Sequence, residues 1–168
     1  MPKIFRILPV VLLIFLSFQS VAAEQQNFSE IQQLAEKGSS LAQAKLGAIY
    51  YLGDGYQLPP NARYKTKAKF KQVSHLLDGV QQNDRLAAEW MLKAAQQVLV
   101  EAEIFMAALY DSGVGVSLST STADQWYRKA ADQGNGTAKA ILGGYKATRL
   151  KASKQIPLEY ALEILTRK

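Results

Sequence analysis

Few side chains in this 168-residue sequence have the type and spacing that catalysis requires. His75 is the only histidine, and apolar Phe70 and Leu77 lie near it at helical spacing, which indicates a half-buried structural residue rather than a general base. Glu101 and Glu103 are two positions apart, so on a helix their carboxylates point to different sides and form no acid–base pair. Nucleophile-elbow, zinc-protease and phosphate-loop motifs are absent from the sequence. We therefore expect no enzymatic activity, no cofactor and no metal site.

The N-terminus has the charge and hydropathy pattern of a secretory signal peptide. Lys3 and Arg6 precede an apolar segment at residues 7–18, and the small residues Val-Ala-Ala follow it. The apolar segment is about 12 residues long, which is too short to span a bilayer comfortably. We therefore expect a cleaved signal peptide of residues 1–23, rather than an uncleaved anchor, and a mature domain of residues 24–168. The favoured location is the periplasm of a Gram-negative bacterium; secretion or membrane anchoring is less favoured.

Charge and cysteine content narrow the class of the mature domain. The formal net charge of the whole sequence is +6. It falls to 6 − 2 = +4 without the signal peptide, which carries two basic and no acidic residues, and this mild excess gives weak support for an acidic partner. Cysteine is absent, so an exported domain must be stabilised by packing rather than by disulfides.

Two copies of one frame reveal an internal repeat. The frame Trp-x-x-Lys-Ala-Ala-x-Gln occupies residues 90–97 and 126–133, which are 126 − 90 = 36 positions apart. A second pattern, which ends in Tyr-x-x-Gly-x-Gly, occupies residues 41–56 and 101–116, and residues 137–147 carry a weaker copy. A period in the middle thirties with two helical patterns per unit is typical of helix hairpins stacked in a solenoid.

Small residues and capping residues fit this arrangement. Gly47 in the first helical pattern predicts close approach of a neighbouring helix, because a larger side chain would hold that helix away. Ser40 and Ser121 are the expected N-caps of two helices. Gly134 is expected to end the second tryptophan helix, because glycine adopts positive φ at little cost.

These patterns together resemble the Sel1-like repeat family, whose members are relatives of tetratricopeptide repeats. The residues that carry the resemblance are Ala-x-x-x-Leu-Gly-x-x-Tyr-x-x-Gly-x-Gly-Val followed by Trp-x-x-Lys-Ala-Ala-x-Gln-Gly. Residues 101–134 match nearly throughout, residues 41–56 and 86–97 match with an insertion between them, and residues 137–168 match weakly. The resemblance implies an all-α fold, a right-handed α/α superhelix whose first helices line a concave face. It also implies an adaptor role in protein assemblies and no shared reaction.

The expected organisation of the mature domain follows from these matches. A last helix is expected to begin at Pro157, because proline suits the first turn. The expected units are a capping helix at 28–38, a repeat at 41–97 with a basic insertion at about 57–82, a repeat at 101–134 and a degenerate C-terminal repeat at 137–168.

One position departs from the repeat pattern. Val98 stands where the second repeat has Gly134, and a β-branched residue resists positive φ. Either a different turn forms near Val98, or two helices fuse. We favour the turn, because the neighbouring repeats impose a hairpin and tertiary packing can override local preference.

The insertion carries a basic segment. Pro59 and Pro60 interrupt the chain, and a helix is then expected from Asn61 to about Leu77, because no partner strand is visible for the alternative, a basic strand. The segment is either a solvated helix that pads the first repeat or a basic contact surface for an acidic protein, with anionic lipid as a weaker partner. Nucleic acid is not expected, because an exported protein does not meet it. Its cations are Arg63, Lys65, Lys67, Lys69 and Lys71.

Columns that differ from repeat to repeat are the candidate binding residues of the concave face, because the packing rule does not fix them. We expect part of these columns to belong instead to the core between repeats. The candidate protein-binding residues, together with the lysines of the insertion, are Lys45, Ile49, Tyr51, Phe105, Leu109, Asp111, Tyr145, Lys65, Lys67, Lys69 and Lys71.

The sequence thus predicts a non-enzymatic, periplasmic protein-binding module that serves as an envelope adaptor or regulator. An alternative is an immunity protein that neutralises a toxin delivered to the periplasm. A second, less favoured alternative is an enzyme that acts on the cell wall, for which the usual catalytic residues are missing.

Overall fold

The computed structural model describes residues 27–144 and 146–167, and the side chains of residues 27–144 and 155–167. The predicted signal peptide lies outside the described residues. Within them the chain forms helices and no strands, and none of these helices is long and apolar enough to cross a membrane. The elements in chain order are α2 (Phe28–Glu36), α3 (Ser40–Leu52), α4 (Tyr64–Val73), the 3-10 turn η2 (Ser74–Leu76), α5 (Asp84–Gln96), α6 (Val100–Ser112), α7 (Thr120–Asp132), α8 (Gly136–Leu142) and α9 (Lys146–Thr166).

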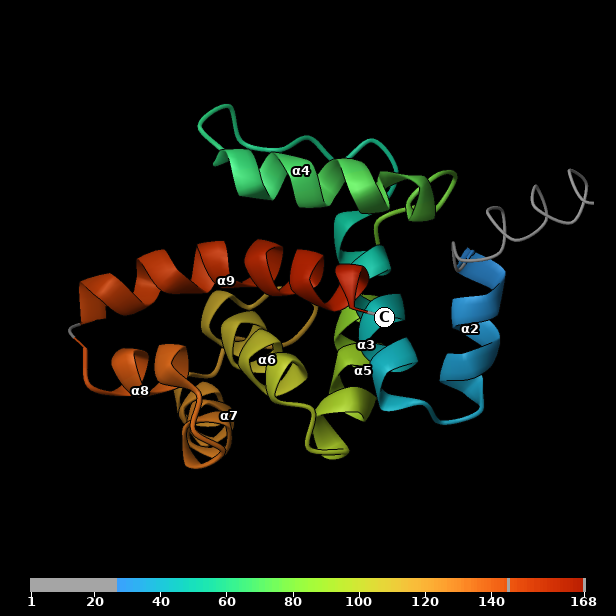
Figure 1. Ribbon diagram of the computed structural model, residues 1–168. Helices are drawn as coiled ribbons and strands as arrows, with labels where there is room; N and C mark the ends of the chain where they lie inside the picture. The colour runs from blue at the N-terminus through green and yellow to red at the C-terminus, as the bar shows by residue number, and fades with distance from the viewer. Residues whose placement is uncertain (1–26, 145, 168) are drawn as a thin grey trace, which may run out of the picture.

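The helices stack one on the next. α2 packs on α3, α3 on α5, α5 on α6, α6 on α7 and α7 on α8 (Figure 1). The hairpins α3–α5 and α6–α7 are the two complete repeats, with α2 before them and the short α8 after them. The predicted all-α class and right-handed α/α superhelix are confirmed.

The two tryptophan frames occupy equivalent places in this stack. Lys93 Nζ lies 3.9 Å from the centre of the Trp90 ring, and Lys129 Nζ lies 4.1 Å from the centre of the Trp126 ring. In each pair the two residues are one helical turn apart, so the ammonium group covers the ring face in a cation–π contact. The frame thus forms the same local structure in α5 and α7.

The final glutamine of each frame ties its helix to the first helix of the same repeat. Gln97 Nε2 donates to Gln43 Oε1 at 2.7 Å, and Gln133 Nε2 donates to Glu103 Oε2 at 2.7 Å. Gln43 and Glu103 are equivalent positions of α3 and α6, so the frame specifies a recurrent hydrogen bond across each hairpin. Such a bond contributes about 1 kcal/mol.

A small residue lets α3 and α5 touch, as the sequence predicts. A Cβ added at Gly47 would lie 3.0 Å from the carbonyl oxygen of Ala87 and 3.1 Å from the backbone nitrogen of Met91. Both atoms belong to the backbone of α5, so they cannot move aside as a side chain can. Gly47 therefore sets the spacing of the first hairpin.

The N-caps of α3 and α7 differ from the predicted residues. Ser39, not Ser40, caps α3: its side chain accepts from the backbone N–H three residues on at 3.3 Å. Ser119, not Ser121, caps α7 in the same way at 3.2 Å. Both predictions were wrong because several serines and threonines precede these helices, and spacing alone does not select among them.

A turn separates α5 from α6, which confirms the interpretation that we favour at Val98. α5 ends at Gln96, α6 begins at Val100, and Val98 between them has φ +64°. The equivalent turn residues Gly38 and Gly134 have φ +95° and +92°. Valine in this left-handed region costs roughly 1–2 kcal/mol, so the turn is locally strained.

The insertion forms the predicted helix, but the helix is shorter. α4 begins at Tyr64, and the residue before it, Arg63, makes no side-chain capping bond. The Phe70 ring of α4 lies 5.9 Å from the ring of Tyr56 in the preceding loop. Beyond α4, the carboxylate of Asp54 accepts a hydrogen bond from the backbone of Gly79 at 3.2 Å, which closes the base of the insertion.

The C-terminal helix takes a course that the sequence did not predict. α9 begins at Lys146, and Pro157 lies inside it rather than in its first turn. Instead of packing mainly on α8, α9 runs back across α3 and α6, and α4 lies on its other side (Figure 1). The chain thus covers the first helices of both repeats with its own C-terminus.

Candidate binding surfaces

The concave face lined by α3 and α6 is the first candidate surface, and α9 occupies it. The buried side chains of α9 belong to the same hydrophobic core as the central residues of α3 and α6. Burying four aliphatic side chains of this size contributes on the order of 10 kcal/mol before conformational entropy is counted. Because these side chains are part of the core, α9 is a structural part of the fold. The four side chains are Ile156, Leu162, Ile164 and Leu165.

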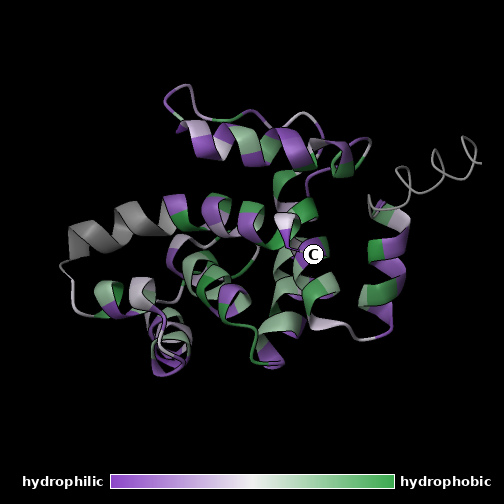
Figure 2. Ribbon diagram, in the orientation of Figure 1, coloured by the Kyte–Doolittle hydropathy of each residue, from purple (hydrophilic) through white to green (hydrophobic). Residues whose placement is uncertain are grey.

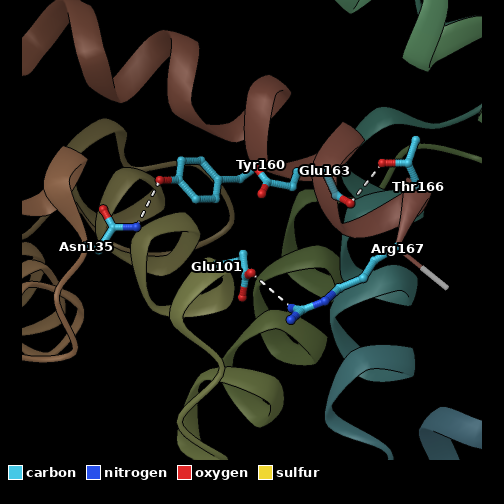
Figure 3. A network of polar contacts seen from close by, with 6 residues as sticks. All are labelled: Glu101, Asn135, Tyr160, Glu163, Thr166 and Arg167. Carbon is cyan, nitrogen blue, oxygen red and sulfur yellow. Dashed lines mark hydrogen bonds and ion pairs between the residues drawn. The ribbon is translucent and has the colours of Figure 1, made fainter.

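Polar contacts accompany the apolar packing of α9 (Figure 3). Asn135 Nδ2, before α8, donates to the hydroxyl of Tyr160 at 3.4 Å. Arg167, just after α9, forms an ion pair with Glu101 of α6, with Nη1 3.0 Å from Oε1. The two side chains of the ion pair are 49% and 21% exposed, so water screens them and the pair contributes less than about 1 kcal/mol. Apolar burial, rather than these contacts, holds α9.

Most of the predicted concave residues are therefore not accessible. Lys45, Ile49, Phe105 and Leu109 are buried. The expectation of an open concave face was wrong, because the apolar members of this set pack in the core that α9 completes. Tyr145 lies outside the described residues.

Tyr51 and Asp111 of the predicted set are half-buried. The ring of Tyr51 on α3 meets the ring of Phe105 on α6 edge-on, with centroids 5.2 Å apart. Burial, together with the nearby Tyr56 and Asp84, raises the pKa of Tyr51 to about 12, so its phenol stays neutral. Such an edge-to-face pair is typical of a packed core, and here it joins the two repeats.

Burial shifts the pKa of two ionisable residues in the first helices of the repeats, Lys45 and Glu103. Burial lowers the pKa of Lys45, and the charge of Glu30 partly opposes this effect. Burial raises the pKa of Glu103, while Lys129 and the hydrogen bond from Gln133 act in the opposite direction. Glu103 is engaged with the tryptophan frame across the hairpin, so we assign it a structural rather than a chemical role.

The second candidate surface is the outer side of α4, where Figure 2 shows strongly hydrophilic stretches. Its inner edge carries Thr66, Phe70 and buried Val73. All the predicted cations are exposed. Because residues four apart share a face, these lysines form two pairs on opposite flanks of that edge. One pair is Lys65 and Lys69, and the other is Lys67 and Lys71.

The charges within α4 destabilise this helix. It contains no acidic residue, and within the described part of the chain none of its lysines lies within ion-pair distance of a carboxylate. Each like-charged pair four residues apart costs about 0.2–0.5 kcal/mol. Lys65 and Lys67 also lie in the first turn, where the helix dipole disfavours cations. Local rules that a sequence breaks in this way often mark a functional site.

The fold and these surfaces define an α/α repeat protein, and the comparisons with known proteins identify the repeat. The Sel1 repeat family model matches residues 40–64, 74–98 and 100–135, which is just over half of the sequence. The chain therefore belongs to the Sel1 repeat family. The matches leave out most of α4 and the whole of α8 and α9. α9, which covers α3 and α6, and α4, which packs on α9, are therefore two additions to the repeats.

Two relatives support this assignment. The crystal structure of a Sel1 repeat protein from Oxalobacter formigenes is similar, with a TM-score of 0.54 and 28% identity, over 84% of this chain and 91% of that one. Chitin synthase regulatory factor 3 of Schizosaccharomyces pombe is 28% identical over 153 residues. The alignment covers 80% of this chain but only 16% of that protein, so the chain spans about a sixth of its length.

Proposed function

We propose that this protein is a non-enzymatic protein-binding module that acts as an adaptor or regulator in the bacterial periplasm. The observation that carries the proposal is the stack of Sel1 repeats, which mediate protein–protein contacts in general. The name of one relative, a regulatory factor, also supports a regulatory role. On this stack the helix α4 presents exposed lysines that form no ion pair with the carboxylates in the described part of the chain.

The non-enzymatic part of the proposal rests on the sequence, which lacks the usual catalytic motifs. Among the described residues, no group of three or more histidines, cysteines and carboxylates could hold a metal ion. His75 is exposed on the turn after α4, so the interpretation of a half-buried residue was wrong, and Glu101 pairs with Arg167.

The proposed location rests on the N-terminal sequence pattern. Fractionation of cells that produce the full-length protein should place it in the periplasmic fraction, and N-terminal sequencing should give a chain that begins at Glu24. A chain that keeps residues 1–23, or that stays in the cytoplasm, would refute this part of the proposal.

Partner binding is tested with the mature protein, residues 24–168. We expect capture from envelope extract to recover a specific protein, and titration of the two purified proteins to give saturable, stoichiometric binding. The control is the same capture with an unrelated exported domain of similar net charge. The proposal fails if the purified pair does not bind, or if the mature protein turns over an envelope substrate.

An immunity protein remains the second candidate function, and the exposed basic side of α4 favours it, because it suits a toxin with an acidic surface. Deletion of the gene should then sensitise cells to attack by sister cells. Unchanged survival in such a competition would exclude this role and leave the adaptor role intact.

A further inference from the structure

We infer that one flank of α4, formed by Tyr64, Lys67 and Lys71, is a docking surface for an acidic segment of a partner protein. The inference rests on the proposed protein-binding function and deepens it, because it names the surface and the chemistry of the partner. It places the contact on the insertion, outside the concave face of the repeats.

The first step is that the usual surface of a helical repeat is occupied. α9 lies across α3 and α6, and its Leu162 and Ile164 are almost completely buried. A partner that used this face would have to displace a helix that completes the hydrophobic core. A partner that used α4 would displace nothing.

The second step is that α4 is held in a fixed position. Its inner edge packs on α9, and Phe70 contacts Tyr56. The hydrogen bond between Asp54 and Gly79 closes the base of the insertion. Cations on a positioned helix offer a defined pattern, in contrast to charges on a mobile loop.

The third step selects the flank. Tyr64 is 85% exposed, and helix geometry places it outermost, beside Lys67 and Lys71. Lys65 and Lys69 lie on the other flank. Two cations one helical turn apart can pair with two carboxylates that are one turn apart on a partner helix. The exposed tyrosine beside them adds contact area, and aromatic residues of this kind are enriched at protein–protein interfaces.

The fourth step favours a protein over a lipid surface. A helix that lies on a membrane buries an apolar face in the lipid. The apolar edge of α4 is turned toward the body of the protein, where Val73 is buried, and Tyr64 is the one large hydrophobic residue that α4 exposes. Little apolar surface is therefore available to drive insertion of α4 into a bilayer. Charge pairing with an acidic segment of a protein needs no exposed apolar face.

The experiment measures binding of the mature protein to a fluorescein-labelled helical peptide of Glu-Ala-Ala-Ala repeats by fluorescence anisotropy, at about 0.15 M ionic strength, where charges more than about 8 Å apart are screened. The same peptide with glutamine in place of glutamate is the ligand control. Vesicles of phosphatidylcholine with and without phosphatidylglycerol test the lipid alternative. The variants are K67E/K71E and Y64S on the proposed flank, K65E/K69E on the other flank, and R128E/K139E away from α4. Glutamate is favourable at positions 65 and 67 in the first turn of α4 but unfavourable at position 71 in its last turn, so circular dichroism must show that each α4 variant keeps its helix content.

We expect K67E/K71E to weaken binding of the acidic peptide roughly tenfold, and Y64S to weaken it by a smaller factor. K65E/K69E and R128E/K139E should change it less than about threefold, and the glutamine peptide should not bind. Wild-type affinity in K67E/K71E, equal losses in either control variant, or binding to anionic vesicles in preference to the peptide would overturn the inference. Once a natural partner is purified, unchanged affinity for K67E/K71E would overturn it too, while the proposed function would stand. Failure of the wild-type protein to bind any partner would instead refute the proposed function.

Discussion

Replacement of Val98 by glycine should stabilise this protein. Val98 has φ +64° in the turn between α5 and α6. The equivalent position is Gly38 in the turn between α2 and α3, and Gly134 in the turn between α7 and α8. Left-handed backbone costs a residue with a Cβ roughly 1–2 kcal/mol. Glycine recovers this cost but loses about 0.5–1 kcal/mol through the greater entropy of the unfolded chain. The valine side chain is 62% exposed, so little burial is lost. The net expectation is a gain of roughly 0.5–1 kcal/mol.

Chemical denaturation of Val98→Gly against the wild type measures this gain, and thermal unfolding should show a rise in Tm of about 1–4 °C for a domain of this size. The matched control is the reverse change at the equivalent turn, Gly134→Val. A Cβ at Gly134 would meet nothing within 4 Å, so backbone strain of about 1–2 kcal/mol is the only expected cost. The lower entropy of the unfolded chain offsets about 0.5–1 kcal/mol of it, which leaves a net loss of about 0.5–1 kcal/mol.

The reasoning requires that Val98→Gly raises the free energy of unfolding and that Gly134→Val lowers it. If Gly134→Val loses stability but Val98→Gly does too, then the valine side chain makes a stabilising contact that its exposure does not show. If neither variant changes stability, then the turn between α5 and α6 does not require left-handed backbone, and the fused-helix alternative returns.

Three further changes test the core. Burial raises the pKa of Glu103, so the stability that its protonated form contributes is lost as pH rises from the ordinary glutamate pKa through the raised one. Glu103→Gln, which copies the amide pair of the first repeat, should remove this loss and raise stability at neutral pH relative to the wild type. A denaturation series in which the variant keeps the wild-type pH dependence would contradict the cause we assign. Leu162→Ala should cost about 2–5 kcal/mol of unfolding free energy, and Arg167→Ala less than about 1 kcal/mol; similar costs in urea titrations would mean that the ion pair holds α9. Gly47→Leu should cost about 1–3 kcal/mol or more by forcing α3 away from α5, and a thermal scan that matches the wild type would show that the helices do not need this close approach.

The repeats were predictable because their residues act locally. Gly47 permits a close approach, each tryptophan stacks with the lysine one turn later, and Gly134 forms a left-handed turn. Each of these roles depends on residue type and on neighbours within one hairpin. The spacing of the types in the sequence therefore carries the information, and the helical fold follows from it.

The course of α9 was not predictable from the same patterns. Pro157 indicated the start of a helix, because a proline inside a helix removes a hydrogen bond and costs about 3 kcal/mol. Packing against α3 and α6 on one side and α4 on the other outweighs this cost. One signal was present: apolar residues from Ile156 to Leu165 lie on most sides of the helix, as expected for a helix enclosed by neighbours rather than one with a single buried face.

The exposure of the cations of α4 could be predicted from the sequence, whereas the burial of the predicted concave residues could not. Exposed cations need no long-range information, because lysines without apolar neighbours stay in water, so the surface of α4 could be expected. Residue types differ between repeats at the columns of Ile49, Phe105 and Leu109, and this difference was interpreted to mean that these side chains do not pack in the core. The same variation arises when a single, non-repeating helix covers both repeats, because each repeat then meets a different part of α9.

The two additions to the repeats depend on each other. α9 carries apolar residues on most sides, so once it lies on α3 and α6 its outer side needs a cover, and α4 supplies one with Phe70 and Val73. That contact offsets the repulsion among the lysines, which an isolated helix of this sequence would not overcome. The closed concave face and the exposed basic surface are therefore one arrangement: α9 fills the groove and, by supporting α4, holds the positive charges in a fixed place where a partner can reach them.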